Sequence, residues 1–180
     1  MIDPDTDLVA RAGQGDRAAA QALMARHLPK MLTVARRMLS SQAEAEDAVQ
    51  DAFLKVWTHA SRWQPGKALF ETWLYRVVMN KCYDRLRKRP NASLDEAVEV
   101  PDVAPQADAV MENTALGKEI EVALAALPER QRAAIVLCHH QECGNIEAAE
   151  ILGISVEALE SLLSRGRRTL RARLAHLKDG

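Results

Sequence analysis

Apolar residues recur at helical spacing along most of the chain, and this pattern predicts helices rather than strands. The clearest case is residues 43–58, where apolar residues return every three or four positions. Similar patterns predict helices over residues 5–26 (broken near Gly13 and Gly15), 28–40 and 70–89. No segment shows the alternation of apolar and polar residues that is typical of a half-buried strand. The expected fold class is therefore all-α.

A change in composition divides the chain into two small helical domains. The first, residues 1–89, ends where a helical pattern meets Pro90, because the residue before proline disfavours the α conformation. Residues 90–117 contain six acidic residues and no Lys or Arg, which indicates a flexible acidic linker with a helix restarting near Ala107. Residues 118–180 form the second predicted domain.

Residues 145–165 carry the spacing of a helix-turn-helix. Ala149 lies four residues before Gly153, and the apolar Leu159 lies six residues after it. A small residue lets two helices cross closely, a glycine turns the chain, and an apolar residue anchors the second helix. Ser155 is placed to cap that second helix. A plain helical hairpin is the alternative, but the basic run that follows directly favours DNA as a partner.

The outward face of this second helix is the candidate surface for duplex DNA. Its residues are Ser155, Glu157, Glu160, Ser161, Ser164, Arg165 and Arg168. The formal net charge of the chain is only −1, yet residues 161–180 hold six basic residues against one acidic residue. Such asymmetry indicates nucleic-acid contact at chosen faces. Its ordinary alternative is that basic residues at helix ends complement the helix dipole.

A second candidate surface lies on helix 70–89 and the loop before it. Basic side chains beside planar rings, with an amide that can read a base edge, suit melted DNA. The candidate residues are Trp63, Arg76, Asn80, Tyr83, Arg87 and Lys88. Four other aromatic residues of this part of the chain, Phe53, Trp57, Phe70 and Trp73, are expected in the core.

Three segments, in this order, resemble the extracytoplasmic-function (ECF) sigma factors. Residues 45–57 are similar to that family's polymerase-binding helix, and residues 70–89 to its promoter-melting helix. The third match is residues 127–132 together with the helix-turn-helix. The resemblance extends over nearly the whole chain and keeps the order and spacing of the motifs.

The resemblance implies a bacterial initiation factor that binds core RNA polymerase and promoter DNA. The first domain would open the minus-ten element, with loop 61–69 holding a flipped base, and the second would read the minus-thirty-five element. The polymerase would contact the polar face of helix 43–58, at Asp47, Gln50, Asp51, Leu54 and Lys55. An anti-sigma factor, often membrane-anchored in the family, is the expected regulator. RNA synthesis belongs to the polymerase, so no enzymatic activity, cofactor or small-molecule substrate is expected.

The sequence departs from the family pattern at two places. Glu160 and Leu162 stand where family members commonly have Lys or Arg, which changes the expected contacts to the minus-thirty-five element. Cys138, His139, His140 and Cys143 replace a tyrosine-rich stretch. A helix would present His139 and Cys143 together to zinc, but no four-ligand set is visible, so ordinary helix packing is expected and no metal site is predicted.

Two other classes of protein fit part of the pattern. A sigma-like decoy that titrates an anti-sigma factor would keep the helical surfaces without the DNA-reading groups. A helix-turn-helix regulator would leave the aromatic first domain and the acidic linker without a role.

The sequence also predicts a cytoplasmic protein. Its three cysteines are scattered, its N-terminus lacks the pattern of a signal peptide, and its longest apolar run is only Ala133–Cys138.

Overall fold

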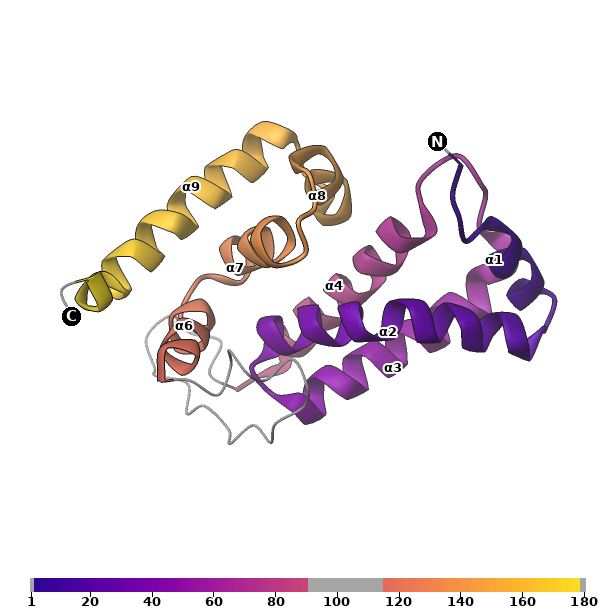
Figure 1. Ribbon diagram of the computed structural model, residues 1–180, viewed down its shortest axis with the longest axis horizontal. Helices are drawn as coiled ribbons and strands as arrows, with labels where there is room; N and C mark the ends of the chain where they lie inside the picture. The colour runs from indigo at the N-terminus through magenta and orange to yellow at the C-terminus, as the bar shows by residue number, and fades with distance from the viewer. Residues whose placement is uncertain (1, 91–114, 179–180) are drawn as a thin grey trace.

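The computed structural model describes residues 2–90 and 115–178, and its regular elements there are all helical (Figure 1). The all-α prediction is confirmed for these ranges. The first unit comprises α1 (Thr6–Gly13), α2 (Arg17–Leu39), α3 (Gln42–His59), the 3-10 turn η1 (Ala60–Arg62) and α4 (Phe70–Lys88). The second comprises α6 (Ala115–Ala125), α7 (Glu129–Ile135), the π-helical turn η2 (Val136–His140), α8 (Asn145–Leu152), α9 (Val156–Arg173) and the 3-10 turn η3 (Ala175–Lys178).

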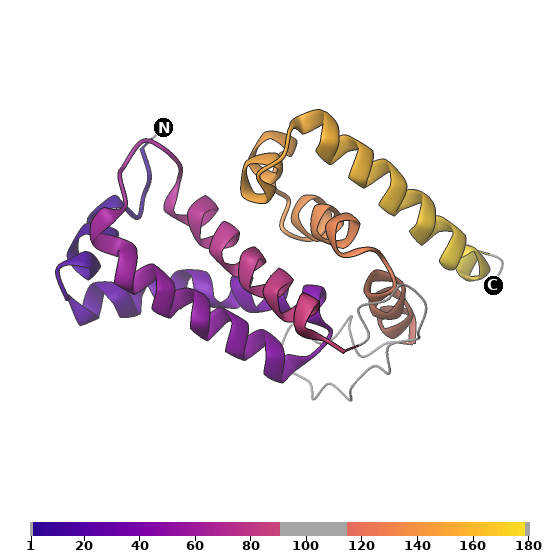
Figure 2. The same ribbon diagram turned by 180° about the vertical axis from the view of Figure 1, so that it is seen from behind.

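Helices α2, α3 and α4 lie side by side and form the body of the first unit (Figures 1 and 2). Capping side chains fix where two of them begin. The Asp16 carboxylate accepts the backbone N–H groups of Ala18 and Ala19 at 2.9 and 3.2 Å, and the Ser41 hydroxyl accepts that of Glu44 at 3.3 Å. These contacts satisfy donors that a helix leaves free in its first turn.

Helix α2 corrects the sequence interpretation, because it runs through the predicted break between residues 26 and 28. Leu23, His27, Met31 and Met38 lie on one continuous buried face of α2, so packing supports a single helix. Pro29 lies inside that helix, although proline removes a backbone donor and crowds the preceding turn. The predicted break near Gly15 is confirmed: Gly15 has φ +90° between α1 and α2.

The start of the second unit also differs from the prediction. Helix α6 begins at Ala115, so the last three residues of the predicted linker 90–117 are helical. The rest of that linker from residue 91, and the expected helix restart near Ala107, lie outside the described residues. Helix α7 follows Pro128 directly.

The two units are in contact, with α4 against α8 and α2 against α6 and α7. Their buried apolar residues form one continuous cluster. Arg132 of α7 is itself buried, and its guanidinium donates to the backbone carbonyls of Met38 in α2 and of Ala125 and Leu127 in the second unit. Burial, and then the nearby positive charge of Arg89, lower the pKa of Arg132 to about 10. This side chain therefore ties the two units together.

Among the helices described, none combines the length and the apolar character that crossing a bilayer requires.

Candidate nucleic-acid and protein interfaces

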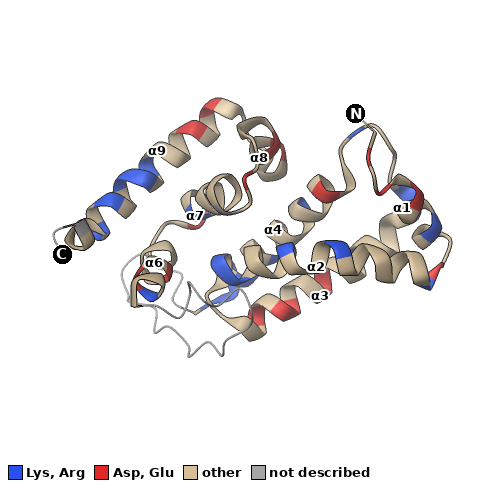
Figure 3. Cartoon of the chain, in the orientation of Figure 1, with Lys and Arg blue, Asp and Glu red and all other residues tan. Residues whose placement is uncertain are grey.

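The outward face of α3 presents the five residues predicted to contact the polymerase. Asp47, Gln50, Asp51, Leu54 and Lys55 are all exposed. Leu54 is 58% exposed, and the face around it carries acidic residues (Figure 3). Asp51 forms an ion pair with Arg85 of α4 at 2.9 Å. The structure thus groups these residues on one accessible surface.

A pocket of about 400 Å³ opens between the end of α3, the loop before α4 and α4 itself. Its lining combines positive charge with two indole rings, the residue types that hold single-stranded DNA. The lining residues are His59, Arg62, Trp63, Gln64, Lys67, Ala68, Thr72, Trp73, Arg76 and Glu150. Two of the predicted DNA-binding residues, Trp63 and Arg76, therefore meet in one pocket.

The two indole rings both pack against the same aromatic side chain, that of Phe70. Phe70, the first residue of α4, is fully buried. Its ring lies edge-on to Trp63, with centroids 6.3 Å apart, and to Trp73, with centroids 5.9 Å apart. Both tryptophans are half-buried. The prediction that Trp73 lies in the core is confirmed in part, because its half-buried ring packs against the core and also lines the pocket.

The remaining candidates on α4 divide into two groups. Asn80, Arg87 and Lys88 are exposed, and they continue away from the pocket along α4. Tyr83 is less accessible than these three residues, because its ring is half-buried and packs against the core. Burial, and then the nearby negative charge of Glu129 on α7, raise the pKa of Tyr83 to about 12.

The second unit forms one wall of the pocket. Arg76 donates to the backbone carbonyl of Glu150 in α8, so its guanidinium is already engaged. Thr72 donates its hydroxyl to the Glu147 carboxylate at 3.2 Å. Tyr75, buried in α4, donates to the Gln141 side-chain oxygen at 3.0 Å. These polar contacts between the units were not predicted from the sequence.

The helix-turn-helix prediction is confirmed in α8 and α9. Gly153 turns the chain with φ +65°, and the Ser155 hydroxyl accepts the Ala158 N–H at 3.1 Å. Ala149 and Leu159 are buried where the two helices meet. All seven outward residues predicted on α9 are exposed.

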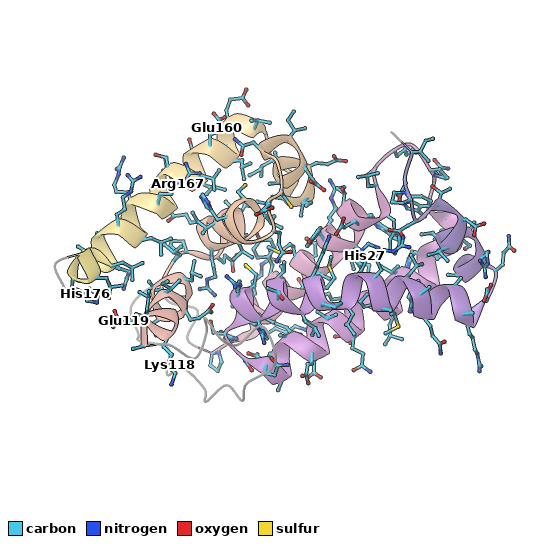
Figure 4. All side chains as sticks on the ribbon, viewed as in Figure 1. His27, Lys118, Glu119, Glu160, Arg167 and His176 are labelled. Atoms are coloured by element: carbon cyan, nitrogen blue, oxygen red, sulfur yellow. The ribbon has the colours of Figure 1, made fainter. Side chains whose placement is uncertain are left out.

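Charge is distributed unevenly along α9. Its first turns carry acidic residues and its later turns carry arginines (Figure 3). Glu160 and Arg167 mark these two parts in Figure 4. Buried Gly166 lets α9 approach α7, because a Cβ atom there would lie 3.1 Å from the Ile135 side chain. The basic part of α9 is therefore held at a fixed distance from the body of the second unit.

The helix expected to present His139 and Cys143 together does not extend that far. The π-helical turn ends at His140, and Cys143 lies in the loop that follows. His139 accepts a hydrogen bond from Arg167 at 3.1 Å, and burial together with this charge lowers its pKa. Burial raises the pKa of Cys143 to about 12. In residues 2–90 and 115–178, no three potential metal ligands come together.

Comparison with protein-family models defines the class of protein. Residues 23–91 match Sigma-70 region 2, and residues 117–170 match Sigma-70, region 4. The first match contains α3, α4 and the pocket-lining residues other than Glu150, and the second contains Glu150 and the helix-turn-helix. The two units are thus the two conserved regions of a sigma-70-type initiation factor.

Relatives narrow this class to one family. The chain is 33% identical over 179 residues to the ECF RNA polymerase sigma factor SigM of Mycobacterium tuberculosis, covering 98% of this chain and 87% of that protein. It is 32% identical over 176 residues to SigW of Bacillus subtilis, covering 91% and 93%. The match to SigE of Mycolicibacterium smegmatis has 32% identity over 168 residues and covers 89% of this chain, but it spans only 65% of SigE. The chain belongs to the ECF RNA polymerase sigma factors, which are transcription initiation factors and not enzymes.

Solved structures agree with the fold of both units together. CnrH in complex with the cytosolic domain of CnrY matches with a TM-score of 0.74 and 29% identity, covering 97% of this chain and 99% of that one. The sigma factor RpoE in complex with the anti-sigma factor NepR from Bartonella quintana matches with a TM-score of 0.70 and 25% identity, covering 86% and 96%.

Proposed function

We propose that this chain is an alternative sigma factor that binds core RNA polymerase in the cytoplasm and directs initiation at a distinct set of promoters. The observation that carries the proposal is the pocket beside α4, where Trp63, Trp73 and Arg76 form a basic, aromatic site within the region 2 match. A base turned out of the minus-ten element would stack on an indole, while the cations would hold the neighbouring phosphates.

Each remaining surface has one proposed partner. The exposed face of α3, from Asp47 to Lys55, binds core polymerase. The exposed residues of α9 enter the major groove of the minus-thirty-five element, as the second helix of a helix-turn-helix does. Glu160 is suited to accept a hydrogen bond from the amino group of a cytosine. Arg165 and Arg168 are suited to phosphates.

An anti-sigma factor is the proposed regulator of these surfaces. CnrH and RpoE, which share this fold, were solved in complex with CnrY and NepR. A membrane-anchored regulator is the form that we expect from the family. The sigma-like decoy is the less favoured function, because the DNA-facing cations Arg76 and Arg87 and the amide of Asn80 are all present. A conventional helix-turn-helix regulator leaves the pocket in region 2 unused.

Transcription in vitro tests the proposal. Purified protein, core polymerase and a pool of genomic promoters should give promoter-dependent transcripts whose start sites align. Binding of polymerase without any transcript, over a complete genomic pool, would contradict the promoter role. Absence of polymerase binding by a folded chain would favour the decoy.

Replacing Asn80 by alanine should impair promoter opening without weakening polymerase binding. Loss of one amide contact to DNA is worth about 1–3 kcal/mol, so open-complex formation should fall about five- to a hundred-and-fiftyfold. Potassium permanganate footprinting of a duplex promoter measures opening. A promoter already mismatched across the minus-ten element should restore most of the activity. Gln21→Ala, which removes an exposed amide of α2, is the control. Equal loss on duplex and mismatched promoters would exclude a role in opening.

Replacing Arg165 by alanine should weaken holoenzyme binding to the minus-thirty-five element similarly for all sequences. A lysine or arginine that contacts phosphate releases about one counterion, so the slope of log affinity against log salt should become shallower by about one. Fluorescence anisotropy with a labelled duplex, at several salt concentrations, measures that slope. Arg17→Ala removes the same charge from an exposed position on α2 and should leave the slope unchanged. An unchanged slope for Arg165→Ala would remove this residue from the DNA interface.

A further inference from the structure

The residues ahead of α1 reach into the interior of the first unit. Asp3 is 8% exposed and Asp5 is 2% exposed, although both are acidic. A buried carboxylate is costly unless hydrogen bonds or charges compensate it. Both carboxylates have such partners: those of Asp3 include the start of α4, and those of Asp5 lie on α2.

Asp3 caps a helix that begins 67 residues later in the chain. One carboxylate oxygen accepts the backbone N–H of Phe70 at 2.5 Å, and the other accepts the N–H of Asp5 at 2.8 Å. Leu69, the residue at the N-cap position of α4, provides no side-chain cap. A negative charge at the N-terminus of a helix is also favoured by the helix dipole. Asp3 therefore provides the side-chain cap that Leu69, at the N-cap position of α4, does not provide.

Asp5 adds a second anchor through α2. Its carboxylate pairs with Arg26 and lies 2.7 Å from Nε2 of His27. His27 is buried in the first unit (Figure 4). Its ring lies edge-on to that of Phe70, with centroids 5.5 Å apart and planes at 63°. Phe70 is thus held at its backbone by Asp3 and at its ring by the Asp5–His27 pair.

Phe70 in turn supports the pocket. Its ring contacts both Trp63 and Trp73, which line the pocket where a flipped base is proposed to bind. The N-terminal segment does not line the pocket. A continuous path nevertheless runs from the Asp3 carboxylate through Phe70 to both indoles.

We propose that Asp3 is a positioning residue for recognition of the melted minus-ten strand. Its carboxylate fixes the first residue of α4, and so sets the separation of the two indoles that receive the base. The inference rests on the proposed function, because it assumes that the pocket binds single-stranded DNA. Asparagine at this position would keep one acceptor oxygen but lose the charge and the second acceptor.

The test measures binding of holoenzyme to a single-stranded minus-ten oligonucleotide taken from a promoter identified by in vitro transcription. Asp3→Ala should weaken this binding about tenfold, and Asp3→Asn about threefold, because the alanine variant loses both charge-assisted contacts. Affinity for core polymerase and for minus-thirty-five duplex should stay within about twofold of the unmodified protein. All affinities are measured at a temperature where circular dichroism shows every variant folded. Asp7→Ala, an exposed acid of α1 whose side chain is 80% accessible, is the matched control.

A role in overall stability alone would lower the melting temperature and leave the oligonucleotide affinity of the folded protein unchanged. That result would overturn the proposal, as would equal losses of oligonucleotide, polymerase and duplex affinity. If Asp3→Ala does not fold, Asp3→Asn decides, and unchanged oligonucleotide affinity in that variant would overturn the proposal too.

Trp63→Ala and Arg76→Ala distinguish a failure of the proposed DNA-binding pocket from a failure of the proposed role of Asp3. Unchanged binding in both would overturn the pocket and this inference together, whereas weakened binding in both with full binding by Asp3→Ala would overturn this inference alone.

Discussion

Replacing Asp51 by arginine is expected to abolish binding of core RNA polymerase while the fold survives. Asp51 is exposed on α3, so the substitution creates no cavity and buries no charge. It reverses the charge at the centre of the face proposed to contact the polymerase and opposes Arg85, which lies 2.9 Å from the Asp51 carboxylate. Like charges brought together at an interface cost several kcal/mol, so affinity should fall at least about a hundredfold. Biolayer interferometry with immobilised core polymerase measures the change.

Two further variants separate the polymerase contact from the ion pair within the chain. Asp7→Arg makes the same change of charge on an exposed position of α1 and should bind polymerase normally. Combining Asp51→Arg with Arg85→Asp restores an ion pair between α3 and α4 but leaves the α3 face reversed. Recovery of polymerase binding by this double variant would show that the ion pair, and not the α3 face, is what the polymerase requires.

Replacing Arg132 by methionine is expected to lower the free energy of unfolding by about 2–4 kcal/mol. The guanidinium serves three backbone carbonyls, of Met38, Ala125 and Leu127, and methionine leaves them without these donors. Removing the buried positive charge offsets part of this destabilisation, because burial disfavours the charged guanidinium and lowers the pKa of Arg132 to about 10. Urea unfolding followed by circular dichroism measures the difference.

Arg130→Met is the matched control for this prediction. Arg130 lies two residues earlier on α7 and is exposed, so its loss should change stability by no more than about 0.5 kcal/mol. A similar cost for both variants would mean that the three carbonyl contacts of Arg132 contribute nothing beyond the loss of a positive charge.

Features set by short stretches of sequence were predictable. The helix-turn-helix depends on Ala149, Gly153 and Leu159, which lie close together in the chain, and their spacing was enough to locate it. The exposed face of α3 was also predictable, from the helical spacing of apolar residues over residues 43–58. The burial of Tyr83 was not predictable in this way, because its helical position says which side of α4 it occupies but not that the second unit lies close to that side.

Features set by distant residues were not predictable. Nothing in the local sequence indicates that Asp3 caps α4 or that Arg132 reaches the end of α2, since each contact depends on how the helices assemble. Helix α2 shows the same limit, because burial of one continuous face supports a helix that contains Pro29. The pocket was only partly foreseen: Trp63 and Arg76 were named, whereas the wall formed by Glu150 comes from the second unit.

The pocket wall formed by Glu150 has an energetic consequence for the order in which polymerase and DNA bind. A melted strand that uses Arg76 must displace the Glu150 carbonyl, and therefore must work against the contact between α4 and α8. The apparent affinity of the isolated chain equals its intrinsic affinity multiplied by the fraction of molecules in which this contact is open. If about one molecule in a hundred is open, affinity falls about a hundredfold, or roughly 2.7 kcal/mol. If core polymerase holds the two units apart, this cost is removed in advance, and we expect the proposed DNA-contacting residues to bind more tightly in the holoenzyme than in the free chain.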